Sequence, residues 1–181
     1  MAAPAGTFVN TSGASTYAPC AMGSFSNEQG ADACSKCPSG QYANSLGSKA
    51  CKTCPAGTFS SGGAGSCQAC SAGYYSPAGS GACSPCKSGT FSRSAASGTC
   101  SACPAGSQCP LIATTAPVAC RAGHYASKTG ASLCSPCPIN TYQTGTGSTS
   151  CKACAAGTST RGLTGQSACT KLRTSLRRSM L

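Results

Sequence analysis

The cysteines are the residues of this chain whose type and spacing could do chemistry. The chain has 181 residues and eighteen cysteines, and seven pairs of them have the spacing Cys-x-x-Cys. Cysteines at this spacing bind zinc, exchange with disulfides in redox enzymes, or form structural disulfides. The rest of the sequence has to decide among these three uses.

Zinc binding is the main alternative to a disulfide scaffold. The spacing Cys-x2-Cys-x13-Cys-x2-Cys is close to that of a zinc ribbon, but structural zinc sites take ligands in fours. Four lone cysteines do not fit such sets, and His124 is the only histidine. Thioredoxin-type chemistry needs a strand–helix–strand context, which the sequence lacks. We therefore favour structural disulfides and predict no metal ligands.

The inventory of other reactive side chains argues against catalysis. Glu28 and Asp32 are the only carboxylate side chains, so a carboxylate pair or a calcium cage has no material. His124 would have to act alone. The abundant glycines recur with a repeat and form no phosphate-binding motif. The sequence predicts no enzymatic activity and no cofactor.

The composition predicts that cross-links replace a hydrophobic core. Leu, Ile, Val and Phe number fifteen, about 8% of the chain, and tryptophan is absent. Cysteine makes up about 10%, the level typical of secreted disulfide scaffolds. Such a chain needs an oxidising compartment, which predicts an extracellular or cell-surface location.

One repeat explains the positions of most residues. An opening cysteine is followed by Pro-x-Gly-x-(Phe/Tyr), a Ser/Ala/Gly-rich run, and a closing cysteine three positions before the next opening one. The period of 16–17 residues indicates about ten repeats in a linear array. The predicted segments are 1–19 (a degenerate repeat without cysteines), 20–102 (five regular repeats), 103–119 (an irregular repeat), 120–170 (three regular repeats) and 171–181 (a basic tail).

Glycines and aromatics keep fixed places in the repeat. A glycine stands three residues after each opening position except at Asn140, and asparagine tolerates the left-handed backbone region best after glycine, so we predict a positive φ there. A second glycine stands four residues before most closing positions and is replaced by Ala96 in the sixth repeat. The residue five after the opening position is Phe or Tyr, except at Gln108 and Ser159. We expect these rings to pack on neighbouring disulfides.

The first repeat indicates how the cysteines pair. The sequence PAGTF occurs at 4–8 and again at 55–59, but Ala3 and Tyr17 replace the opening and closing cysteines of the first repeat. A repeat that loses both has lost one bridge, which favours sequential pairing over crossed pairing of each Cys-x-x-Cys with the next. The predicted disulfides are Cys20–Cys34, Cys37–Cys51, Cys54–Cys67, Cys70–Cys83, Cys86–Cys100, Cys103–Cys109, Cys120–Cys134, Cys137–Cys151 and Cys154–Cys169.

With CPAGTF, Cys-x-x-Cys and CPAGSQCPLIATTAPVAC together, the chain resembles the ephrin type-A/B receptor-like cysteine-rich repeat over residues 4–170. More loosely, it is similar to the cysteine-rich modules of tumour necrosis factor receptors. The resemblance implies short two-stranded ladders stacked into an elongated rod with little hydrophobic core. It implies ectodomains of receptors, adhesion, matrix or cell-wall proteins, and no kinase activity.

Charge and end segments bear on partners and location. The net charge of +11 would attract polyanions, although most basic residues are scattered singly and only the tail is clustered. The segment 1–10 lacks the features of a signal peptide, and PLIATTAPVA is half the length of a membrane span. We therefore expect no membrane span, and expect a piece of a longer ectodomain. Asn10 begins a weak glycosylation sequon.

The sequence thus predicts a structural or spacer segment of an extracellular protein. The alternative is a binding module for an extracellular protein or an anionic polysaccharide, without specific nucleic-acid binding. A cysteine-rich zinc-binding protein is the less favoured third possibility.

Overall fold

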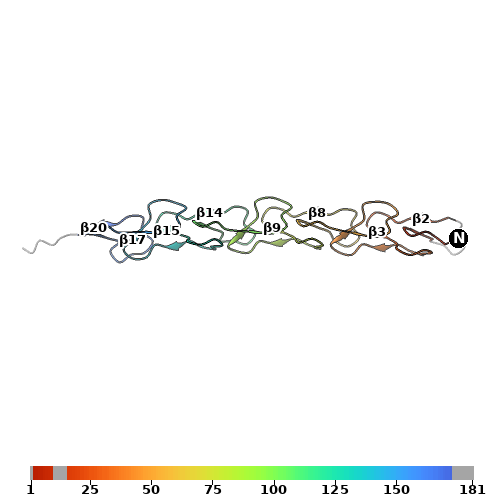
Figure 1. The fold of residues 1–181 in the computed structure, drawn as a ribbon, viewed down its shortest axis with the longest axis horizontal. Coiled ribbons are helices and arrows are strands. Elements are labelled where there is room, and N and C mark those ends of the chain that lie inside the picture. The colour runs from red at the N-terminus through yellow and green to blue at the C-terminus, as the bar shows by residue number, and fades with distance from the viewer. Residues whose placement is uncertain (1, 10–15, 173–181) are drawn as a thin grey trace, which may run out of the picture. The chain divides into compact units, whose positions relative to one another are not determined.

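The computed structural model describes residues 2–9 and 16–172. Within these ranges the regular structure consists of two-residue strands that form ten two-stranded sheets, with no helix (Figure 1). The strands are β1 (Thr7–Phe8), β2 (Ala18–Pro19), β3 (Ser24–Phe25), β4 (Ser35–Lys36), β5 (Gln41–Tyr42), β6 (Lys52–Thr53), β7 (Thr58–Phe59), β8 (Gln68–Ala69), β9 (Tyr74–Tyr75), β10 (Ser84–Pro85), β11 (Thr90–Phe91), β12 (Ser101–Ala102), β13 (Ser107–Gln108), β14 (Val118–Ala119), β15 (His124–Tyr125), β16 (Ser135–Pro136), β17 (Thr141–Tyr142), β18 (Lys152–Ala153), β19 (Thr158–Ser159) and β20 (Thr170–Lys171).

The fourth repeat shows how each hairpin forms. The residues after its opening cysteine make a tight turn in which the Thr58 backbone N–H donates to the Pro55 carbonyl at 3.1 Å. Gly57 is the third residue of this turn and has φ +85°, a conformation that type II turns require at that place. After this turn, β7 pairs antiparallel with β8, which consists of the two residues inside the next Cys-x-x-Cys.

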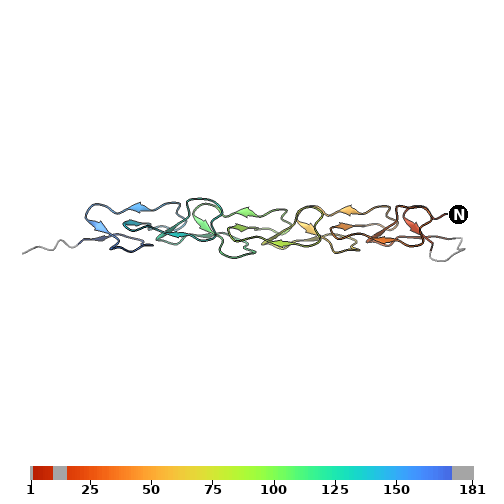
Figure 2. The same cartoon turned by 90° about the horizontal axis from the view of Figure 1, so that it is seen from below.

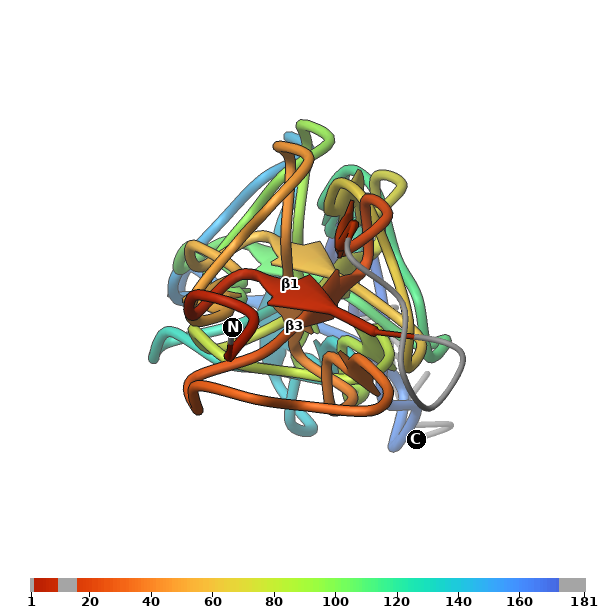
Figure 3. The ribbon, with the colours of Figure 1, turned by 90° about the vertical axis from the view of Figure 1, so that its right-hand side faces the viewer.

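The chain divides into two compact units. The first contains residues 1–86 and 92–101, and the second contains 87–91 and 102–181. In Figures 1 and 2 the hairpins of the first unit follow one another in chain order, from red towards green. Figure 3 views the same unit from its N-terminal side, with β1 in front of β3.

Within each unit, consecutive repeats are joined by three hydrogen bonds from backbone N–H groups, and the acceptors are backbone carbonyls except at Asn140, whose N–H donates to Thr160 Oγ1 at 2.9 Å. In the first unit the third repeat is joined to the fourth by Gly40 N–H to Ser60 O, Ala43 N–H to Ala64 O and Gly63 N–H to Cys37 O, at 2.8–3.1 Å. In the second unit the eighth repeat is joined to the ninth by Gly123 N–H to Gln143 O, Ala126 N–H to Ser148 O and Gly147 N–H to Cys120 O. The first bond uses the turn glycine, and the third uses the glycine before the closing position. Both glycine series thus supply backbone donors to contacts between repeats, and the Ala96 N–H makes the equivalent bond to Cys70 O at 2.8 Å.

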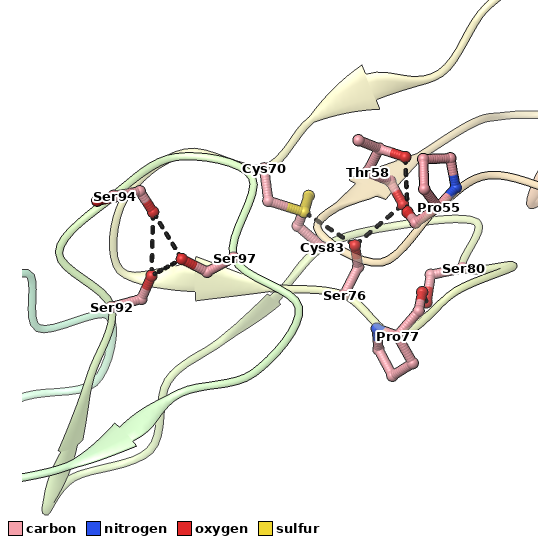
Figure 4. Close-up of a disulfide and its surroundings, with 10 residues drawn as sticks. All are labelled: Pro55, Thr58, Cys70, Ser76, Pro77, Ser80, Cys83, Ser92, Ser94 and Ser97. Carbon is pink, nitrogen blue, oxygen red and sulfur yellow. Dashed lines mark hydrogen bonds between the residues drawn. A yellow bond between two sulfur atoms is a disulfide. The ribbon is translucent and has the colours of Figure 1, made fainter.

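The small core follows the opening positions. Opening cysteines from Cys20 to Cys137 are 0–1% exposed, and Ala3 fills the same place in the first repeat. Where a serine stands six residues after the opening position it is also buried, and in two repeats its hydroxyl bonds to the preceding repeat. Ser60 Oγ donates to Gln41 O at 2.9 Å, and Ser76 Oγ donates to Thr58 O at 3.0 Å (Figure 4). Burial of these hydroxyls is tolerated because each has a hydrogen-bond partner.

Repeats two apart also touch. A methyl group on Gly57 would overlap the carbonyl oxygen of Ala96, which lies two repeats further along the first unit. Gly157, at the same place in the tenth repeat, has nothing within 4 Å of such a methyl group. Asn140 in the ninth repeat is exposed and has φ +62°. The Asn140 side chain is thus accommodated at a turn position that, within the described residues, no repeat two further along covers.

The structure confirms the predicted class of small disulfide-rich hairpin repeats with few buried residues. It also confirms positive φ at the turn position, including Asn140. Ala96 has φ +57°, which was not predicted. Positive φ at Ala113 and Arg161 was not predicted. The Asn10 sequon and residues 173–181 of the basic tail lie outside the described residues.

Candidate functional site

The cysteines are the first candidate site, and the structure uses all eighteen in nine disulfides. Eight bridges join residues 13–15 apart, and the bridge of the seventh repeat joins residues six apart. The pairs are Cys20–Cys34, Cys37–Cys51, Cys54–Cys67, Cys70–Cys83, Cys86–Cys100, Cys103–Cys109, Cys120–Cys134, Cys137–Cys151 and Cys154–Cys169. Closing cysteines are half-buried, whereas Cys103 and Cys109 are both fully buried.

The short bridge of the seventh repeat has a visible origin in the regular repeats. In the fifth repeat the Cys70 sulfur lies 3.4 Å from the Ser76 hydroxyl (Figure 4). Cys109 stands in its own repeat where Ser76 stands in the fifth, six residues after the opening cysteine. A cysteine in that place therefore meets the opening sulfur directly. Pro117 occupies the closing position that this bridge leaves without a cysteine.

The aromatic residues of the repeat are half-buried. Phe59 and Cys83 line one hollow between the fourth and fifth repeats, together with Gln68 and Tyr74. The ring and one sulfur-bearing residue of the next disulfide thus border the same hollow. In the seventh repeat Gln108 takes the place of the ring, and its Oε1 accepts a hydrogen bond from the Cys134 backbone N–H at 2.8 Å.

The other candidate residues are dispersed. Glu28 and Asp32 are exposed in the first unit, whereas His124 belongs to the second, where it contacts Arg121 and the Ala122 carbonyl. Among the described residues, no three His, Cys, Asp or Glu side chains are grouped as a metal site would require. The described part of the chain also contains no helix long and apolar enough to cross a membrane.

The repeat geometry can be compared with known protein families. The model of the family described as tyrosine-protein kinase ephrin type A/B receptor-like matches residues 6–50, 73–122 and 123–170. The chain belongs to this family. A search of the curated proteins found no match to this chain. Ephrin receptor-like repeats are a non-catalytic type of cysteine-rich module, and with the nine disulfides they indicate an extracellular location.

Peptide mapping tests the sequential pairing of these ephrin receptor-like repeats. Lys36, Lys52 and Lys152 are exposed inside Cys-x-x-Cys pairs, so trypsin can cut between bridges. With sequential pairing, the unreduced digest is expected to separate at each of these sites. Peptides that join Cys34 to Cys51, or Cys37 to Cys54, would instead establish crossed pairing. Mass spectrometry before and after reduction distinguishes the two results.

Proposed function

We propose that the chain is a non-catalytic spacer segment in the ectodomain of an extracellular, cell-surface, matrix or cell-wall protein. The observation that carries this proposal is the recurrence of the same three backbone donors between consecutive repeats within each unit, with a threonine hydroxyl as the acceptor only for Asn140. A spacer needs a structure that is defined by its own neighbours rather than by a ligand. Arrays of this kind gain stability mainly from contacts between adjacent repeats.

The predicted segments belong to the same proposal. The five regular repeats of 20–102 and the three of 120–170 would supply length, and 103–119 would be a local variation within the array. The segment 1–19 keeps the hairpin of β1 with β2 without a disulfide, so it would extend the array by one further repeat.

Changing the number of repeats tests the spacer function. Removing residues 54–69 deletes one repeat and leaves Cys51, Lys52 and Thr53 in front of Cys70, so the Cys-x-x-Cys spacing is kept. We expect the maximum dimension of the chain, measured by small-angle X-ray scattering, to fall by a fixed step. Duplicating 54–69 should raise it by the same step. An unchanged dimension in both variants, with all disulfides formed, would contradict a spacer.

A binding role is the second candidate, and the surface charge favours it. Ten described Lys and Arg residues are exposed, against the two carboxylates Glu28 and Asp32. Such a surface attracts acidic proteins and anionic polysaccharides at long range. Scattered charges alone do not define a site, so this candidate needs a place where several side chains converge.

A further inference from the structure

One groove of the second unit differs from its equivalents. A hollow of about 430 Å³ lies between the seventh and eighth repeats and is lined by Gln108, Val118, Arg121, His124 and Leu133, with two residues typical of the repeat. We call it the seventh-repeat groove. In the first unit, the hollow of about 360 Å³ between the fourth and fifth repeats is built from equivalent positions, with Phe59 in place of Gln108.

Each of these five residues departs from what the other repeats carry at its position. Where Val118 stands, the others have Ala, Ser, Thr, Gln or Lys, and where Leu133 stands they have only Ala, Ser or Thr. Where His124 stands, they have Thr, Ser, Gln or Tyr. Where Arg121 stands, the others have Pro, Ala or Ser, except for Lys87 in the sixth repeat. Gln108 stands where all other repeats but the tenth have an aromatic ring. Gln108 has a structural partner in the Cys134 backbone N–H, but the hairpin forms elsewhere without the other four residues, so the fold does not explain why they meet here.

The polar side of the groove is ordered by a short chain of hydrogen bonds. Arg121 Nη2 lies 3.4 Å from His124 Nε2, and His124 Nδ1 lies 3.3 Å from the Ala122 carbonyl oxygen. A guanidinium only donates, so Nε2 accepts and the Nδ1 proton is donated to Ala122. Gly165 of the tenth repeat lies near the imidazole. A methyl group added at Gly165 would stand 3.5 Å from His124 Cε1. The guanidinium is thereby held beside the groove, with further N–H donors for a ligand.

The apolar side of the groove is open to solvent. Val118 is 54% exposed and Leu133 is 67% exposed. Burying these branched apolar side chains against a partner would lower the free energy of the complex. The second unit contains no carboxylate side chain, so an anionic group approaching Arg121 meets no competing acid from that unit.

We propose that the seventh-repeat groove binds a protein segment that presents a carboxylate beside an apolar side chain. The carboxylate accepts hydrogen bonds from Arg121, in the charge-assisted geometry that guanidinium groups favour. The apolar side chain covers Val118 and Leu133. An anionic polysaccharide would satisfy Arg121 but would leave both apolar residues largely exposed, so the protein segment fits the whole groove better.

The test uses the full oxidised chain, labelled with ¹⁵N, and a blocked hexapeptide that alternates leucine and glutamate. In ¹H–¹⁵N spectra, we expect shift changes concentrated at residues 118–124 and 133–134, with a Kd of about 1 mM or below. Two comparison peptides, one with serine for leucine and one with glutamine for glutamate, should each bind at least about fivefold more weakly. A heparin octasaccharide is the polyanion probe.

Matched variants separate the groove from general charge. Arg121→Gln is expected to weaken peptide binding about tenfold, whereas Lys128→Gln, with the same loss of charge in the same repeat, should change it less than about twofold. Leu133→Ser should weaken binding about threefold or more, and the equally exposed Leu163→Ser should not. All four side chains are exposed, and the spectra themselves verify the fold.

Three results would overturn the proposal. Equal effects of Arg121→Gln and Lys128→Gln would show non-specific attraction of a polyanion. Tighter binding of the octasaccharide at the same amides would reassign the groove to a glycan. Absence of shifts at the groove with about 5 mM peptide would exclude a site of this kind.

Discussion

Replacing Gly57 with alanine is expected to destabilise the fourth repeat and its neighbours by about 2–5 kcal/mol. The left-handed φ of +85° costs an L-residue about 1–2 kcal/mol. The new methyl group also overlaps the Ala96 carbonyl oxygen, and such overpacking typically costs about 1–3 kcal/mol. Hydrogen exchange of the Ala96 amide, which donates to Cys70 O, measures the local loss.

Three control variants separate the two contributions. Gly157→Ala has a similar φ but nothing within 4 Å of the added methyl group, so it should cost only about 1–2 kcal/mol. Gly57→Asn reduces the backbone penalty and keeps the overlap, so it should remain clearly destabilising. Asn140→Gly should change stability by about 0.5 kcal/mol or less. Equal losses for Gly57→Ala and Gly157→Ala would show that contact between repeats two apart contributes nothing.

The second large effect concerns the order in which the disulfides are reduced. Cys103 and Cys109 are both fully buried, whereas each of the other bridges has a half-buried closing cysteine. A reductant can attack either sulfur of a bridge, so exposure of one is sufficient. Under native conditions, the Cys103–Cys109 bridge should be reduced about tenfold to a hundredfold more slowly than the rest, because its reaction requires local opening.

Alkylation after timed exposure to a phosphine reductant, followed by peptide mass analysis, gives the nine rates. The same experiment in strong denaturant is the control, because unfolding removes the difference in burial and should bring the nine rates close together. Reduction of Cys103–Cys109 before the others would contradict this account. Loop length alone would not predict this result. In the chain-entropy model the bridge that closes the shortest loop, Cys103–Cys109, stabilises the fold least.

Spacing within one repeat predicted much of the fold. The turn glycine and its exchange for Asn140 follow from local backbone requirements, which a single repeat displays, whereas the short two-stranded ladders were implied by the family resemblance. The overlap between Gly57 and Ala96 could not be predicted in this way, because it depends on how far each repeat advances along the stack. The positive φ of Ala113 and Arg161 could not be predicted because neither alanine nor arginine favours that conformation.

The candidate groove was only partly visible in the sequence. Gln108 stood out because it interrupts the aromatic series, and His124 because it is the only histidine. Nothing in the spacing indicated that they line one hollow together with Val118 and Leu133. These four residues come from three strands, β13, β14 and β15, and from the loop before Cys134. Comparing each position among the repeats of the chain is the sequence signal that would have found them together.

The first repeat shows that the hairpin structure does not depend on a disulfide within the same repeat. It has no disulfide, yet Thr7 and Phe8 pair with Pro19 and Ala18 in the register that bridged repeats use. Its backbone also makes the usual three bonds to the second repeat, with Ala3 buried in place of a cysteine. A cross-linked neighbour can therefore act as a template on which an uncross-linked repeat acquires its form. Cysteine pairs could then be lost one repeat at a time during evolution while the architecture is inherited from the repeat beside it.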